Sequence, residues 1–151
     1  MRDQSILNAD RNQCVTVLSL SPFQEDHAAL HDIVGHSKWL LFQANNFLTA
    51  DRVFQERDVS VVLCERDLRP GSWTDVLSQL NGLRHPPSLI VTSRLADERL
   101  WAEALNLGVW DVLAKPFQRT EVLRSIRVAW QHWYDKFQAP MRSMRVMTAA
   151  G

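Results

Sequence analysis

Several polar side chains in this sequence stand directly after short apolar runs, where the strands of a parallel sheet would end. Glu65 follows one such run, and Asp67 comes two residues later. Thr92 ends another run, and Lys115 follows a third. Phosphoryl transfer uses groups of this kind, because a metal ion and cations must neutralise the charge on the transferred oxygens. The carboxylate of Glu65 and the ammonium of Lys115 can instead form an ion pair with each other.

A second set of candidate ligands consists of His27 and His31, which are four residues apart. This spacing on a helix can hold zinc, but no third ligand accompanies the pair. We therefore interpret both as solvent-exposed histidines. Cys14 and Cys64 form no Cys-x-x-Cys pair, which argues against a zinc site built on cysteine. Each cysteine lies in or beside an apolar run, so we expect buried free thiols and no disulfide.

The remaining sequence signals exclude several classes of protein. There is no Gly-x-Gly-x-x-Gly, Walker loop, Gly-x-Ser-x-Gly or His-Glu-x-x-His motif, so nothing indicates a hydrolase or a dehydrogenase, and we do not expect an enzyme. Lysine plus arginine and aspartate plus glutamate both number 17, which leaves no electrostatic footprint for nucleic acid. No stretch approaches the roughly 20 apolar residues of a membrane span. Residues 1–12 lack the apolar core of a signal peptide, so the expected location is the cytoplasm.

The elements that would position these residues alternate regularly along the chain. Apolar runs typical of buried strands occur at residues 15–20, 39–42, 59–64, 89–92 and 111–114. Their near-continuous Val, Leu and Ile content indicates a parallel sheet covered on both faces. A helical pattern follows each run, and this order predicts βα repeated five times. A chain of 151 residues suits one domain, which we place at residues 13–138 between tails at 1–12 and 139–151.

Two of the helix starts carry capping signals. Ser21-Pro22-Phe23-Gln24 combines a proline at the first helical position with a Ser-x-x-Gln capping box. Ser72-Trp73-Thr74-Asp75 contains a second capping box with an acidic partner. We expect a helix to begin at each of these segments.

This arrangement resembles the receiver domain of bacterial response regulators, the signalling modules of two-component systems. The resemblance covers about residues 14–137, and its most specific piece is Gly-Val-Trp-Asp-Val-Leu-Ala-Lys-Pro-Phe at 108–117, which is similar to the family's signature around the fifth strand. It implies a flavodoxin-like (βα)5 sandwich in the α/β class, with a five-stranded parallel sheet of order 2-1-3-4-5. It also implies a cis bond between Lys115 and Pro116, which aims the ammonium into the phosphorylation pocket.

The resemblance assigns places to the other residues at the strand ends. Glu65 occupies the place of the family's phosphoacceptor aspartate, and Asp67 is the rival if the third strand extends two residues further. The family's threonine or serine at the end of the fourth strand corresponds to Thr92, with Ser93 as the alternative. In the family this hydroxyl binds the phosphoryl group and couples it to the face formed by the fourth helix, fifth strand and fifth helix.

The acidic residues with which the family binds magnesium after the first strand are missing from this sequence. Ser19, Leu20 and Ser21 stand at those places, and two hydroxyls are a poor replacement for carboxylate ligands of magnesium. Glu25 and Asp26 lie a turn into the following helix and are expected to point elsewhere. We therefore expect an atypical receiver, or pseudo-receiver, without bound Mg²⁺ and without conventional phosphorylation.

The preferred interpretation is a phosphorelay signalling domain that acts by binding a histidine kinase or a downstream effector. A homodimer through the face of the fourth helix, fifth strand and fifth helix is compatible with it. Trp101 and Trp110 are interface candidates, because tryptophan is enriched at interaction hot spots, although core filling explains them equally well. One alternative is a functional phosphoacceptor that uses Asp67 or Glu65 with Mg²⁺ and dephosphorylates itself. Another is a flavodoxin-like enzyme or cofactor binder, which the missing phosphate-binding loop disfavours.

Overall fold

The computed structural model describes residues 15–138, in which strands and helices alternate from β1 to α6 and a short π-helix follows. The strands are β1 (Thr16–Leu20), β2 (Leu40–Ala44), β3 (Val61–Glu65), β4 (Ser88–Ser93) and β5 (Asp111–Ala114). The helices are α2 (Gln24–Val34), α3 (Phe47–Glu56), α4 (Trp73–Asn81), α5 (Glu98–Asn106), α6 (Arg119–Trp133) and the π-helix η1 (Tyr134–Gln138).

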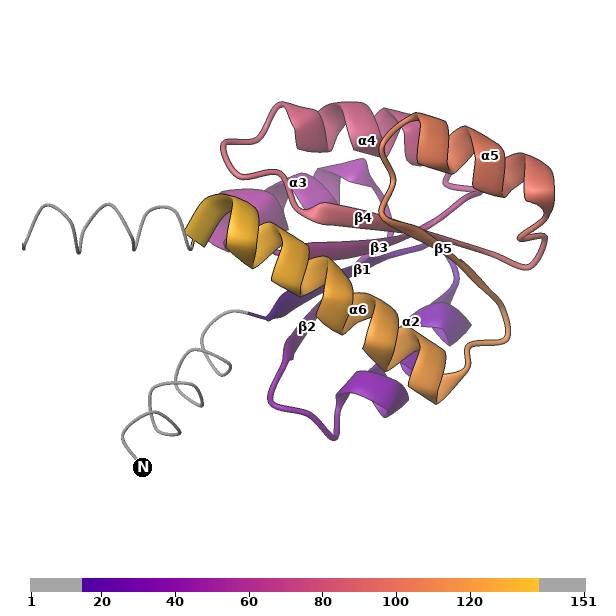
Figure 1. Cartoon of the computed structure of the whole chain (residues 1–151), viewed down its shortest axis with the longest axis horizontal. Coiled ribbons are helices and arrows are strands. Elements are labelled where there is room, and N and C mark those ends of the chain that lie inside the picture. The colour runs from indigo at the N-terminus through magenta and orange to yellow at the C-terminus, as the bar shows by residue number, and fades with distance from the viewer. Residues whose placement is uncertain (1–14, 139–151) are drawn as a thin grey trace, which may run out of the picture.

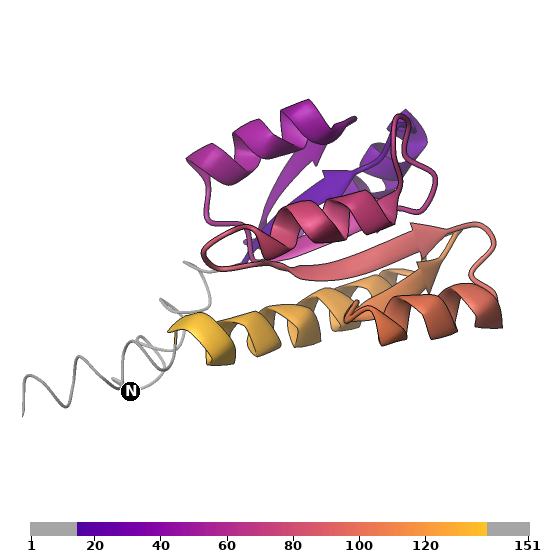
Figure 2. The same ribbon diagram turned by 90° about the horizontal axis from the view of Figure 1, so that it is seen from above.

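All neighbouring strands are parallel, and the sheet has the order β2-β1-β3-β4-β5. Helices α2 and α6 cover one face of the sheet, and α3, α4 and α5 cover the other (Figures 1 and 2). The predicted α/β flavodoxin-like sandwich with strand order 2-1-3-4-5 is confirmed.

The core lies in two layers, one on each face of the sheet. The larger cluster packs the sheet against α3, α4 and α5, and the smaller one packs it against α2 and α6. Every residue of β3 is buried, because this strand lies in the middle of the sheet with helices on both sides. That double burial explains why the central strands are continuous apolar runs without polar alternation.

The strand ends differ in places from the sequence prediction. The second strand runs from Leu40 to Ala44, two residues beyond the predicted end, because each of its residues pairs with one residue of β1. The third strand extends one residue further than predicted and includes Glu65, which pairs with Thr92 of β4. This register places Glu65 inside the sheet and not in the loop that follows it.

One of the two predicted capping boxes is present. Ser72 accepts a hydrogen bond from the first turn of α4, and the Asp75 carboxylate accepts one from the backbone N–H of Ser72. The Ser-x-x-Gln box at Ser21 does not form, and this prediction is wrong. The N-cap residue of α2 is Phe23, which makes no side-chain capping bond, and the Ser21 hydroxyl is bonded to Asp26 instead.

The predicted free thiol of Cys64 is present and fully buried. Both predicted tails, at 1–12 and 139–151, lie outside the described residues, as do residue 13 and Cys14. Within residues 15–138, no helix is long and apolar enough to cross a membrane.

Candidate functional site

The carboxyl ends of the parallel strands meet at one edge of the sheet, and polar side chains gather there. Glu65 ends β3, Thr92 and Ser93 end β4, and Lys115 follows β5 directly. All four side chains belong to residues that are buried or half-buried. This is the edge at which open α/β sheets place their ligands, so these residues define the candidate site.

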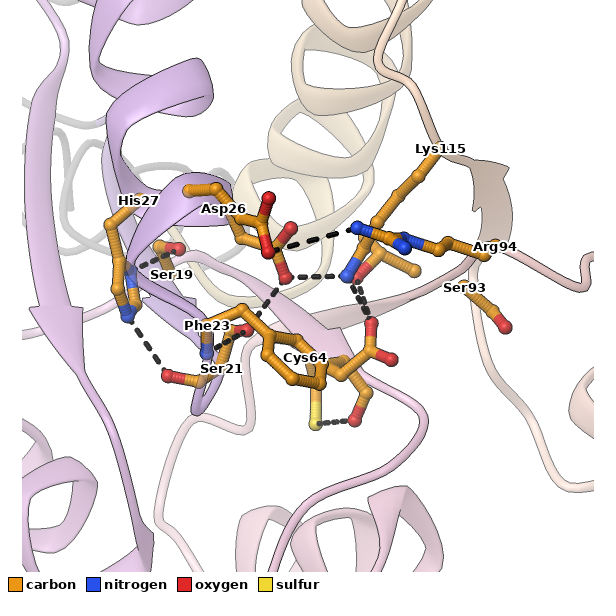
Figure 3. A network of polar contacts seen from close by, with 12 residues as sticks. Ser19, Ser21, Phe23, Asp26, His27, Cys64, Ser93, Arg94 and Lys115 are labelled. Atoms are coloured by element: carbon orange, nitrogen blue, oxygen red, sulfur yellow. Dashed lines mark hydrogen bonds and ion pairs between the residues drawn. The ribbon is translucent and has the colours of Figure 1, made fainter.

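Lys115 is at the centre of the site. Its bond to Pro116 is cis, as the resemblance implied. The ammonium forms ion pairs with the carboxylates of Glu65 and Asp26, and Nζ lies 2.5 Å from Oε2 of Glu65 (Figure 3). The exposed fractions of the three side chains are only 7%, 5% and 8% for Lys115, Glu65 and Asp26. The ion pair suggested by the sequence between Glu65 and Lys115 is therefore present, and a second carboxylate shares the ammonium.

Asp26 points into the site, and the expectation that it points elsewhere is wrong. Because α2 begins at Gln24, Asp26 is the third residue of the helix and still lies in its first turn, beside the carboxyl edge of the sheet. The Ser21 hydroxyl donates a hydrogen bond to Oδ2 of Asp26 at 2.6 Å. A carboxylate in the first helical turn also interacts favourably with the helix dipole. Carboxylates are absent at the end of β1, and Asp26 of α2 brings one to the same edge of the sheet.

His27, the next residue on α2, is buried, and its interpretation as a solvent-exposed histidine is wrong. Its Nε2 lies 2.9 Å from the carbonyl oxygen of Ser21 and 3.0 Å from Oδ1 of Asn45, and both are acceptors. Nε2 therefore carries the proton, and Nδ1 accepts a hydrogen bond of 2.8 Å from the Ser19 hydroxyl. The ring joins α2 to Ser19 of β1 (Figure 3). It also joins α2 to Asn45, in the connection between β2 and α3. His31 is exposed, as predicted.

The three residues at the family's acidic places have other roles here. Ser19 is bonded to His27 and Ser21 to Asp26, while Leu20 is buried in the larger core cluster. The hydroxyls of Ser19 and Ser21 therefore bind side chains in the first turns of α2.

The hydroxyls at the end of β4 differ in what they contact. The Thr92 hydroxyl is directed at Oε2 of Glu65, at 3.4 Å, and belongs to the network around Lys115. Ser93 is buried, and its hydroxyl accepts a hydrogen bond of 3.0 Å from the backbone N–H of Leu95. Of the two alternatives, Thr92 is the residue beside Glu65.

Asp67 lies outside the buried network. Its side chain is 69% exposed, and the nearest cation is the guanidinium of Arg66 at 3.9 Å. It does line the hollow above the network, together with Glu65 and Lys115. Asp67 therefore lies at the exposed edge of this hollow, whereas Glu65 is buried at its base.

A hollow of about 510 Å³ lies above the buried network. The ring of Phe23 lies over the Lys115 ammonium, with Nζ 5.2 Å from the ring centre, and is 42% exposed (Figure 3). At the rim, the Arg94 guanidinium lies 3.7 Å from the Glu25 carboxylate, and both side chains are largely exposed. Phe23 and this surface ion pair partly cover the carboxylates from solvent.

The residues of the site do not fit a magnesium ion. Magnesium prefers octahedral oxygen coordination, including one or two carboxylates. Here the carboxylates of Asp26 and Glu65 both face the ammonium of Lys115, which occupies the point on which they converge. Within residues 15–138, no group of three or more histidine, cysteine, aspartate or glutamate side chains is arranged to hold a metal.

Cys64 lies beside the site but has a different environment. Burial raises the pKa of its thiol, and the charge of Glu65 acts in the same direction. Its Sγ donates a hydrogen bond of 3.3 Å to the carbonyl oxygen of Glu65. The thiol therefore stays protonated in the folded protein and does not act as a nucleophile.

The sequence matches no protein-family model and no curated protein. Solved structures do resemble it. The signal receiver domain of an HD domain-containing protein from Pseudomonas fluorescens Pf-5 superposes with a TM-score of 0.75 at 20% identity, over 84% of this chain and 94% of that one. The chain has the receiver-domain fold.

Two further receivers show the same likeness. The beryllofluoride-activated NtrC4 receiver domain dimer gives a TM-score of 0.71 at 17% identity, over 78% of this chain and 98% of that one. The chemotaxis response regulator CheY4 of Vibrio cholerae gives 0.69 at 11% identity, over 78% and 99%. Identities this low establish the common fold, and the chemistry of the site has to be argued from this chain's own residues.

The two tryptophans considered as interface candidates differ in exposure. Trp101 on α5 is 37% exposed. Trp110 is half-buried, packs against the smaller core cluster, and stacks on His132 with ring centres 4.6 Å apart. Of the two, Trp101 presents more of its surface to a partner.

Sequence reasoning missed Asp26 and His27 as residues of this site. They are adjacent polar residues in the first turns of a helix, and Ser19 and Ser21 flank the last residue of the strand before it. That combination is a usable signal, because serine hydroxyls at the end of β1 need partners when they are buried.

Proposed function

We propose that this chain is a receiver-type signalling module that acts by protein–protein interaction and is not phosphorylated on aspartate in the conventional way. The observation that carries this proposal is the buried network in which Lys115 joins Asp26 and Glu65. The receiver-domain fold supports the two-component context. The replacement of the strand-end acids by Ser19, Leu20 and Ser21 supports the loss of phosphorylation.

The network opposes phosphoryl transfer for two physical reasons. The ammonium of Lys115 is already held by two carboxylates, so it is not free to neutralise charge on a transferred phosphoryl group. The carboxylate of Glu65 is also occupied, because it accepts from both Lys115 and Thr92. A receiver of this kind holds one conformation of its pocket without a phosphoryl group.

The surface around α5 supports an interaction role. Trp101 and Leu105 are four residues apart on this helix, so they lie on the same face, and they are 37% and 52% exposed. Leu95 and Leu107, which flank the helix, are 68% and 49% exposed. We call these four residues the α5 surface. Exposed apolar residues grouped on one element are typical of protein-binding sites.

Strand β4 connects the pocket with the α5 surface. Thr92 contacts Glu65 at one end of this connection, and the Ser93 hydroxyl accepts from the N–H of Leu95 at the other. The conformation of the pocket and the position of the loop before α5 are therefore physically coupled. A histidine kinase, a downstream effector or a second copy of the chain are the partners we propose for this surface.

The proposal is tested by incubating the protein with acetyl phosphate and Mg²⁺ and measuring its intact mass. We expect no phosphoryl adduct on the unmodified sequence. The informative comparison is Glu65→Asp combined with Leu20→Asp, which restores an aspartate at the acceptor place and one acid after β1. Any adduct gained by that double variant shows that the assay detects phosphorylation in this fold.

An adduct on the unmodified protein would contradict the proposal, and peptide mapping would then separate two alternatives. Asp67 lines the same hollow as Lys115, so it is the acceptor to examine first. Glu65 is the second. Either result would favour a functional phosphoacceptor over a phosphorylation-independent module.

A further inference from the structure

A second hollow, of about 610 Å³, lies at the amino ends of β1 and β2, away from the site around Lys115. Its walls are the residue before β1, the connection from α2 to β2, and one face of α6. We call it the amino-edge hollow, and its lining residues are Val15, Ser37, Trp39, Leu123, Arg127, Trp130 and Gln131. Its volume lies within the range of ligand pockets, about 300–1,000 Å³.

The walls of the amino-edge hollow are held in place by hydrogen bonds and packing. The backbone N–H of Leu40 donates to the carbonyl oxygen of Val15 at 3.1 Å, which joins the starts of β1 and β2. The Ser37 hydroxyl donates to the carbonyl oxygen of Val34 at 2.6 Å and accepts from the backbone N–H of Trp39 at 3.2 Å. Trp39, Leu123 and Trp130 also pack against the smaller core cluster. The hollow is therefore formed before anything binds in it.

We propose that residues 1–14 of this chain occupy the amino-edge hollow, with the adjacent apolar residues Ile6 and Leu7 against its two tryptophans. The segment is joined directly to Val15, which is part of the wall. Ile6 is nine residues before Val15, a stretch that reaches about 30 Å when extended at about 3.3–3.6 Å per residue. A ligand attached by so short a stretch has an effective concentration on the order of millimolar. The inference does not depend on the proposed function.

Charge complementarity supports this occupant and sets its orientation. Arg127 lines the hollow and is exposed, and none of the ion pairs within residues 15–138 involves it. Asp10 stands between the apolar pair and Val15, so it passes the hollow when Ile6 and Leu7 enter it. An ion pair between Asp10 and Arg127 contributes more to the register of the segment than to its affinity.

The segment at 139–151 is a poorer occupant. It carries Arg142 and Arg145 and no acidic residue, so its charge is unfavourable beside Arg127. It also follows Gln138, which is not part of the wall of the hollow.

The test is nuclear magnetic resonance of the full chain labelled with ¹³C and ¹⁵N. We expect nuclear Overhauser contacts from the methyl groups of Ile6 and Leu7 to the indole rings of Trp39 and Trp130. Trp101 is the internal control and should show none, because α5 covers the other face of the sheet. The absence of the expected contacts would overturn the inference, as would contacts from the methionine methyls of residues 139–151 in their place.

A mixture of labelled and unlabelled protein identifies the chain to which the bound segment belongs. The inference predicts contacts within one chain, at the same strength after dilution. Contacts only between labelled and unlabelled chains would assign the hollow to a second copy of the protein and would overturn the inference.

Substitutions in the segment test its apolar contact. Ile6→Ser combined with Leu7→Ser should shift the indole N–H signals of Trp39 and Trp130, which are assigned from their Trp→Phe variants. Ala9→Ser is the matched control, because it lies in the same segment outside the apolar pair, and it should leave both signals in place. Unchanged signals in the double serine variant would contradict the inference.

A charge exchange tests the orientation of the segment. Arg127→Glu should shift the same two indole signals, because it places like charges beside each other. Asp10→Arg in the same chain should return them toward their positions in the unmodified protein. Signals that the second substitution does not restore would overturn the placement of Asp10 beside Arg127.

Discussion

The ammonium of Lys115 and the carboxylate of Glu65 form a buried ion pair, with Nζ 2.5 Å from Oε2, at the carboxyl edge of the sheet. The pair joins β3 to the connection between β5 and α6, and Asp26 extends it to α2. Three elements that are far apart in the sequence are therefore held together by one cation.

Removal of the shared cation should destabilise the fold strongly. Lys115→Met leaves two buried carboxylates facing each other, and we expect a loss of about 3–5 kcal/mol in the free energy of unfolding at pH 7. Urea denaturation measures this loss. Lys136→Met is the matched control, because Lys136 is exposed, and it should change stability by no more than about 0.5 kcal/mol. Equal effects of the two substitutions would show that the network contributes nothing to stability.

Loss of the buried imidazole should cost more than loss of an exposed one on the same helix. His27→Ala leaves the Ser19 hydroxyl and the Asn45 amide without their partner and creates a cavity, so we expect a loss of about 3 kcal/mol. His31→Ala should change the free energy of unfolding by no more than about 0.5 kcal/mol. Thermal and urea unfolding of both variants give the comparison, and similar stabilities would argue against the hydrogen-bonded role of His27.

The thiol of Cys64 should be unreactive in the folded protein and should make stability depend on alkaline pH. Burial raises its pKa in the folded state, so the thiol ionises first in the unfolded chain. Its contribution to stability is full below the unfolded pKa, which is about 8.5, and is lost as the pH rises above that value. Cys64→Ala should lose less stability than the unmodified chain over the same range.

The reactivity is measured with a chromogenic disulfide reagent in a Cys14→Ser variant, which leaves Cys64 as the only thiol. We expect almost no reaction at pH 9 without urea and rapid reaction in urea. Rapid reaction of the folded protein would mean that the thiol is accessible.

Trp101 should affect association and leave the fold unchanged. Trp101→Ala removes the largest side chain of the α5 surface, so we expect weaker self-association or weaker binding to a captured partner, with an unchanged unfolding midpoint. Sedimentation velocity over a range of concentrations measures self-association. Trp110→Ala is the comparison, because Trp110 packs against the core and its loss should reduce stability instead. A large drop in stability for Trp101→Ala would assign that residue to the core.

The sequence was sufficient to predict the fold and the centre of the site. The alternation of apolar runs and helical patterns predicted five βα units, and the resemblance implied both the strand order and the cis Lys115–Pro116 bond. Glu65 was predicted directly after the third apolar run, and it is the last residue of β3, where it is buried because it pairs with Lys115.

The sequence was not sufficient to place Asp26 and His27. Their orientation depends on where α2 begins, and the capping signal at Ser21 suggested a start that the structure does not have. A shift of two or three residues along a helix turns a side chain by more than half a revolution. In addition, the Ser21 hydroxyl had two possible partners, and it donates to the Asp26 carboxylate instead of capping the helix.

The most direct test of the central claim is titration of the protein with beryllofluoride and Mg²⁺, followed by ¹⁹F nuclear magnetic resonance. A phosphoryl group or its mimic needs a metal ion and cations to neutralise the charge on its oxygens. Because Lys115 is held by Asp26 and Glu65, the account predicts no bound fluoride signal and no change in the protein's spectrum. A slowly exchanging bound signal that depends on Mg²⁺ would contradict it and would show a working phosphorylation pocket.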